Sequence, residues 1–147
     1  MGPKHFLNFE KISNQEFVSI IERGIELKNS NETEKTLKGK ILGLVFEQPS
    51  TRTRVSFEVG INNLGGSSIF LSGSELQLSR GEPISDTAKV LSSMLDVIVL
   101  RTDNHEKLEI FSQNSSVPII NGLTNFCLLY TSPSPRDATL SRMPSSA

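Results

Sequence analysis

A short apolar run followed at once by a turn and a polar helix start constrains this chain more than any other feature. Residues 41–46 read I-L-G-L-V-F, and an unbroken apolar run of this kind predicts a buried strand of a parallel sheet. Pro49 and Ser50 predict a turn, and Ser50 is a favourable N-cap residue for the helix expected from Thr51. The segment therefore predicts a strand, a tight turn and a helix in direct succession.

The start of this helix combines hydroxyl groups with guanidinium groups. Backbone N–H groups without intrahelical partners and the positive end of the helix dipole point outward there, and Ser50, Thr51 and Thr53 add neutral donors. Arg52 and Arg54 offer the bidentate geometry that phosphate oxygens accept. The pattern predicts a phosphate or phosphoanhydride site. The alternative is a helix start that is only capped, with both arginines in solvent.

Strand and helix patterns alternate along the rest of the chain. We expect helices over 13–28, 51–64, 84–95 and 105–113, and strands over 40–46, 67–71, 96–101 and 117–120. This alternation predicts an α/β fold with a parallel four-stranded sheet flanked by helices on both faces. Ligands of such sheets bind beyond the carboxyl ends of the strands, where residues 50–53, Arg101 and residues 121–124 all fall.

Several segments carry a specific family resemblance. Residues 46–66 read F-E-Q-P-S-T-R-T-R-V-S-F-E-V-G-I-N-N-L-G-G and strongly resemble the carbamoyl phosphate loop of the aspartate/ornithine carbamoyltransferase family. Further resemblances follow in the same order at L-Q-L-S-R-G-E-P-I-S-D-T-A-K-V-L, V-I-V-L-R-T and V-P-I-I-N-G-L-T-N. The resemblance implies that residues 1–126 form a carbamoyl phosphate-binding domain, incomplete at its C-terminus, and that the ornithine-binding domain is absent.

The resemblance also implies roles for individual residues. Ser50, Thr51, Arg52 and Thr53 bind the phosphate of carbamoyl phosphate, and Arg101 is a further ligand of the same substrate. Arg52, Thr53 and Arg101 are the expected catalytic residues. Arg54 is expected to brace the loop or to pair with a carboxylate. The family needs no metal or organic cofactor, because phosphate is a good leaving group once its charge is held.

Two more positions bear on assembly and on completeness of the site. Gln77 matches the residue that reaches into an adjacent subunit's site in the family, which implies a homotrimer; the alternative is an exposed loop glutamine. A His-Pro-x-Gln motif closely follows the N-G-L-T segment in the ornithine branch. By spacing its histidine falls at Leu128 and its glutamine at Thr131, so neither is present.

The amine acceptor is indicated by two loops. Residues 77–83 read Q-L-S-R-G-E-P, without the lysine typical of this loop in the aspartate branch and with the glutamine typical of the ornithine branch. Residues 121–125 read N-G-L-T-N, which resembles the ornithine branch. The resemblance thus implies transfer of the carbamoyl group to the side-chain amine of ornithine, giving citrulline and phosphate in arginine metabolism. Aspartate or another amine as acceptor is an alternative, as is a phosphate-binding module without catalysis. We expect this chain alone to be inactive.

The composition limits the kinds of partner that the chain is expected to bind. The chain has 147 residues with a formal net charge of −1, so the basic excess typical of nucleic-acid binding is missing. No apolar run is long enough to predict a membrane span. The lone cysteine, Cys127, fits a reducing cytoplasm.

The composition changes at Cys127. Residues 127–147 are rich in Ser and Pro and lack apolar periodicity, which predicts a disordered tail. Residues 127–137 and 141–147 can also be back-translated into a transposase-type sequencing adapter, with three residues between them where a sample index falls. Our hypothesis is therefore that the tail is non-native read-through, and genomic reads continuing natively through the codon of Asn125 into that of Cys127 would refute it.

Overall fold

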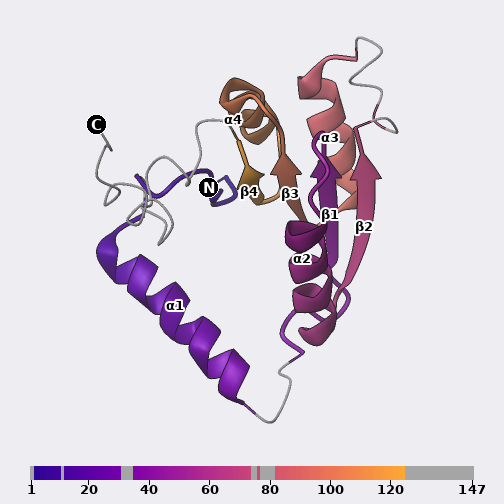
Figure 1. Ribbon diagram of the computed structural model, residues 1–147. Helices are drawn as coiled ribbons and strands as arrows, with labels where there is room; N and C mark the ends of the chain where they lie inside the picture. Colours follow the sequence, from indigo (N-terminus) through magenta and orange to yellow (C-terminus); the bar gives the residue numbers. More distant parts are fainter. Residues whose placement is uncertain (1, 11, 31–34, 74–75, 77–81, 125–147) are drawn as a thin grey trace, which may run out of the picture.

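The computed structural model describes residues 2–10, 12–30, 35–73, 76 and 82–124. Within them lies a four-stranded parallel sheet with the strand order β2-β1-β3-β4 (Figure 1). The strands are β1 (Ile41–Phe46), β2 (Ser67–Ser72), β3 (Val97–Arg101) and β4 (Ile119–Leu123). The predicted α/β fold with a parallel sheet is confirmed, and the predicted strand boundaries differ from these by at most three residues.

Helices cover both faces of the sheet, because strand side chains alternate between the faces. Leu42, Leu44 and Phe46 of β1 pack in one core cluster with Ile61 of α2 (Thr51–Asn63). Val45 faces the other way, into a cluster with Ala88 of α3 (Ile84–Met94) and with two residues of α4 (His105–Gln113). Those two residues are Leu108 and Phe111.

The N-terminal segment closes the free edge of β4. Phe6 forms a parallel bridge with Ile120, its N–H donates to the carbonyl of Ile119 at 2.8 Å, and its carbonyl accepts from the N–H of Asn121 at 2.8 Å. The N–H of Ile119 donates to Nδ1 of His5 at 3.1 Å, and burial lowers the pKa of that imidazole. His5 is thus half-buried and stabilises the sheet edge.

Helix α1 (Asn14–Asn29) begins with a capping box, in which the side chains of Ser13 and Glu16 each accept from the other residue's backbone N–H. The helix has an apolar face, but none of its residues is buried. Ile21 is 48% exposed and Ile25 is 54% exposed. Figure 1 shows α1 lying apart from the sheet. No helix in the described part of the chain is long and apolar enough to cross a bilayer.

Candidate functional site

The turn between β1 and α2 places the predicted anion-binding residues at the sheet edge. Ser50 occupies the N-cap of α2 in an extended backbone conformation, as predicted. Its hydroxyl, however, donates to Oγ1 of Thr53 at 2.9 Å instead of accepting from a backbone N–H of the first turn. The expected side-chain cap is therefore wrong in its detail. The consequence is that the first turn of α2 offers its N–H groups outward without a side-chain acceptor.

Arg52 and Arg54 have different surroundings although they are two residues apart. Arg54 donates from Nε to Oε1 of Glu58 at 2.9 Å, and its guanidinium carbon lies 3.8 Å from the centroid of the Phe70 ring. The prediction that Arg54 pairs with a carboxylate is thereby confirmed. Arg52 is exposed, and it pairs with no carboxylate of the described residues. Of the two guanidiniums, that of Arg54 is already paired with Glu58, whereas that of Arg52 has no carboxylate partner among the described residues.

Arg101 ends β3 beside an irregularity in β4. The register shifts between Leu100, which faces Asn121, and Arg101, which faces Leu123, so Gly122 is the extra residue of a bulge. Nη1 of Arg101 donates to the carbonyl of Gly122 at 3.2 Å, while its buried Nε has no hydrogen-bond partner among the described residues. A Cβ on Gly122 would lie 2.8 Å from Cγ1 of Val99, so only glycine fits here. The bulge orients Arg101 and leaves part of its guanidinium unsatisfied.

Strand register brings the predicted site residues to one edge. Phe46 at the end of β1 is paired with Arg101 at the end of β3, and Arg101 is paired with Leu123 at the end of β4. Residues 50–53 leave directly from the end of β1, so they and Arg101 share the carboxyl edge, as predicted. Gln77 lies outside the described residues. An open hollow on the outer side of α2 includes Thr51 and Arg52 in its lining.

A polar cluster that the sequence did not indicate lies at the same edge. Lys107, in α4, donates from Nζ to both carboxylate oxygens of Glu47, at 3.1 and 3.0 Å, and Thr102 donates from Oγ1 to Oε2 at 2.5 Å. Burial alone would lower the pKa of Lys107, but its hydrogen bonds and charge interactions with Glu47 and Asp103 outweigh this and raise that pKa. Fifty-five or more residues separate Glu47 from these donors, so no local pattern reveals the cluster.

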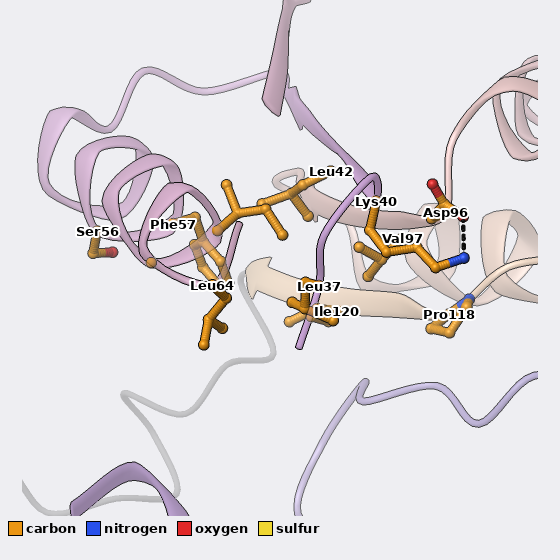
Figure 2. Close-up of a pocket in the computed structure, with 12 residues that line it drawn as sticks. Leu37, Lys40, Leu42, Ser56, Phe57, Leu64, Asp96, Val97, Pro118 and Ile120 are labelled. Carbon is orange, nitrogen blue, oxygen red and sulfur yellow. Dashed lines mark hydrogen bonds and ion pairs between the residues drawn. The ribbon is translucent and has the colours of Figure 1, made fainter. Parts of the chain in front are cut away.

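An apolar cavity lies elsewhere in the described part of the chain. It has a volume of about 470 Å³ and is lined mainly by apolar side chains of α2 and of the strand starts, among them Leu42, Phe57 and Ile120 (Figure 2). The ion pair between Lys40 and Asp96, at 2.8 Å, is part of its wall. Lys40, Asp96 and Pro118 mark the amino ends of three strands. This cavity is therefore at the opposite end of the sheet from Arg52 and Arg101.

A parallel sheet with guanidiniums and hydroxyls gathered at its carboxyl edge defines the chain as an α/β domain of the class that places its ligand at that edge. The chain matches the carbamoyl-P binding domain of aspartate/ornithine carbamoyltransferases over residues 4–127. It belongs to the aspartate/ornithine carbamoyltransferase family.

Relatives and solved structures agree with this assignment. The ornithine carbamoyltransferase of Methylococcus capsulatus is 56% identical over 125 residues, which are 85% of this chain and 42% of that protein. The anabolic ornithine carbamoyltransferase of Campylobacter jejuni has a similar structure, with a TM-score of 0.78 and 45% identity over 82% of this chain and 39% of that one. The catalytic subunit of M. jannaschii aspartate transcarbamoylase gives a TM-score of 0.73 and 38% identity, over 82% and 40% of the two chains. This chain thus spans about two fifths of the length of the relatives that it matches.

Proposed function

We propose that this chain is the carbamoyl phosphate-binding part of an enzyme that transfers the carbamoyl group to the side-chain amine of ornithine. The products are citrulline and phosphate, in arginine metabolism. The observation that supports this most directly is the placement of Arg52, with no carboxylate partner among the described residues, on the same sheet edge as Arg101. Carbamoyl phosphate presents a dianionic phosphate and a planar carbonyl, and two separate guanidiniums suit these two groups.

The reaction needs positioning and charge stabilisation. The amine nitrogen attacks the carbonyl carbon, a tetrahedral oxyanion forms, the bond from carbon to the bridging oxygen breaks, and phosphate leaves while the amine loses a proton. In our proposal Ser50, Thr51, Arg52 and Thr53 hold the phosphate, and Arg52, Thr53 and Arg101 stabilise the charge that develops on the carbonyl and bridging oxygens. In this proposal the charge of the substrate and of the oxyanion is met by these side chains and by the N–H groups of α2, so no metal or organic cofactor enters the proposed mechanism.

Ornithine is the proposed acceptor because the relatives cited above from Methylococcus capsulatus and Campylobacter jejuni carry that name and because residues 121–125 read N-G-L-T-N. Aspartate is the second candidate, favoured by the structural similarity to an aspartate transcarbamoylase. We further propose that the intact enzyme is a cytoplasmic homotrimer in which Gln77 reaches a neighbouring site. For the chain as given we propose binding of carbamoyl phosphate without useful citrulline synthesis, and a non-native tail at 127–147.

Calorimetry with carbamoyl phosphate and a citrulline assay on the 147-residue chain test the proposal. A charge-assisted hydrogen bond contributes roughly 1.5–3 kcal/mol, so Arg52→Ala is expected to weaken binding by about one to two powers of ten. Arg54→Ala is the matched control, because it also removes one positive charge, two residues from Arg52. The Arg54 side chain already contacts Glu58 and Phe70. Equal affinities of Arg52→Ala and the unmodified chain for carbamoyl phosphate would contradict the proposed site. Citrulline formation by the chain would contradict its proposed inactivity.

A further inference from the structure

Glu47 stands between the two segments that carry the candidate substrate ligands. It follows the last residue of β1 and precedes Ser50 by three residues. Its backbone N–H donates to the carbonyl of Arg101 at 2.8 Å, so its main chain is bonded to the other candidate ligand. On its far side, Gln48 and Pro49 are exposed and make no hydrogen bond to the described residues. Glu47 is therefore the last anchored residue before the turn that presents Ser50.

The carboxylate of Glu47 is held from two elements. Oε2 accepts from Thr102, the residue after Arg101, and that threonine is only 2% exposed. Both oxygens accept from Nζ of Lys107 in the first turn of α4, and the Glu47 side chain is 18% exposed. The backbone of Glu47 lies close to Gly73, because a Cβ at Gly73 would lie 3.1 Å from Cα of Glu47. A mostly buried carboxylate that accepts three hydrogen bonds restricts the position of its own backbone.

We propose that Glu47 is a positioning residue for carbamoyl phosphate, and that Thr102 and Lys107 hold its carboxylate so that the turn at 48–50 sets residues 50–53 at a fixed place relative to Arg101. This inference rests on the proposed function. According to this proposal, the anionic side chain of Glu47 supports the binding of a dianion without contacting it.

Charge makes the proposal testable. If Glu47 acted only through its field, Glu47→Gln would remove a negative charge from the neighbourhood and strengthen the binding of an anion. Lys107→Met would remove a positive charge and weaken it. A positioning role predicts that both substitutions weaken binding, because each breaks the hydrogen bonds between Glu47 and Lys107. It also predicts that the double variant loses no more affinity than the single variant that binds more weakly.

The experiment measures the dissociation constants of carbamoyl phosphate and of inorganic phosphate with the 147-residue chain by calorimetry. Glu47→Gln and Lys107→Met are each expected to raise the constant for carbamoyl phosphate by about tenfold, because small displacements of binding groups have effects of this order. Lys107→Arg is expected to restore most of the affinity lost in Lys107→Met. Glu106→Gln is the matched control for Glu47→Gln, because it also removes one negative charge, from an exposed residue next to Lys107 in α4. It is expected to leave binding unchanged or slightly stronger.

Amide resonances of Thr51, Arg52 and Thr53 provide a second measurement that does not depend on affinity. They are expected to shift in Glu47→Gln and Lys107→Met, while resonances of the core strands and the urea midpoint stay near those of the unmodified chain. Tighter binding by Glu47→Gln, additive losses in the double variant, or unshifted resonances at 51–53 would each overturn the proposal. If the unmodified chain binds no carbamoyl phosphate, the proposed function fails first; if it binds and the Glu47 variants bind equally well, only the positioning role fails.

Discussion

At the scale of single residues, a glycine inside α2 and a glycine just after it differ in the space around them. Gly60 lies inside α2, and a Cβ there would meet nothing within 4 Å. Gly66 lies between α2 and β2, and a Cβ there would lie 2.8 Å from the carbonyl oxygen of Lys40, which also accepts from the N–H of Ser67 at 2.9 Å. The first site is open, whereas the second is closed by a hydrogen-bonded backbone.

Alanine substitutions are therefore expected to change the free energy of unfolding in opposite directions. Gly60→Ala is expected to raise it by about 0.5–1 kcal/mol, because alanine restricts the unfolded chain and favours the helix. Gly66→Ala is expected to lower it by about 1–3 kcal/mol, because the added methyl group has to displace backbone or the buried Ile61. Urea unfolding of the two variants beside the unmodified chain measures both, and a Gly66→Ala chain of unchanged stability would contradict the packing described.

Sequence patterns indicated some of the candidate site residues and missed others, because such patterns detect only local features of the chain. The position of residues 50–53 and of Arg101 at the carboxyl edge was predictable, because each lies at the carboxyl end of an apolar strand and parallel strands end at one edge. The hydrogen bond between Ser50 and Thr53 was not, since a serine at an N-cap has several acceptors within reach. Glu47 reads as an ordinary polar residue after a strand, and only the fold brings Lys107 to it.

At the scale of elements, the edge of β4 depends on a hydrogen bond to a titratable side chain, His5. Nδ1 of His5 accepts from the N–H of Ile119, and this bond requires an unprotonated Nδ1. Burial lowers the pKa of His5 below its ordinary value of 6.5. The unfolded chain therefore binds a proton in a pH range in which the folded chain does not, so stability falls as the pH drops through about 6.5 toward the lower folded value.

The free energy of unfolding is expected to decrease between about pH 7.5 and pH 5.5. His5→Asn is the matched variant, because its amide offers an acceptor in a similar place and does not titrate in this range. Every other titratable group is present in both chains, so the comparison isolates His5. Urea unfolding at several pH values gives the result, and an equal pH dependence in both chains would show that His5 does not carry the effect.

The elements themselves were predictable nearly in full, and β4 shows where prediction ends. Its expected range was 117–120, but the strand is Ile119–Leu123 and includes Asn121 and Gly122, residues that favour turns. They remain in the strand because Asn121 donates from Nδ2 to the carbonyl of Leu7 and accepts from the N–H of Leu123. Tertiary hydrogen bonds from the N-terminal segment outweigh local propensity at this edge.

At the scale of the whole molecule, the apolar surface is divided between a packed core and an unpacked helix. The side chains of Val45, Ile98, Leu108 and Ile119 are each 0% exposed and belong to one cluster across three strands and α4. The ring of Phe17 contacts that of Phe9, but no residue of α1 is buried, although the pattern of the helix alone predicts a buried stripe. Periodicity indicates which face of a helix is apolar, but it does not indicate what covers that face.

Truncating the two apolar surfaces to alanine is expected to give unequal losses of stability. Ile21→Ala and Ile25→Ala are expected to change the free energy of unfolding by no more than about 0.5 kcal/mol, because both side chains are already about half exposed and alanine favours a helix. Leu108→Ala, also on a helix, is expected to lower it by about 2–5 kcal/mol, because it leaves a cavity in the core. Losses of 2 kcal/mol or more at Ile21 and Ile25 would mean that α1 is packed in solution, and sedimentation equilibrium at two concentrations would show whether a second copy provides the packing.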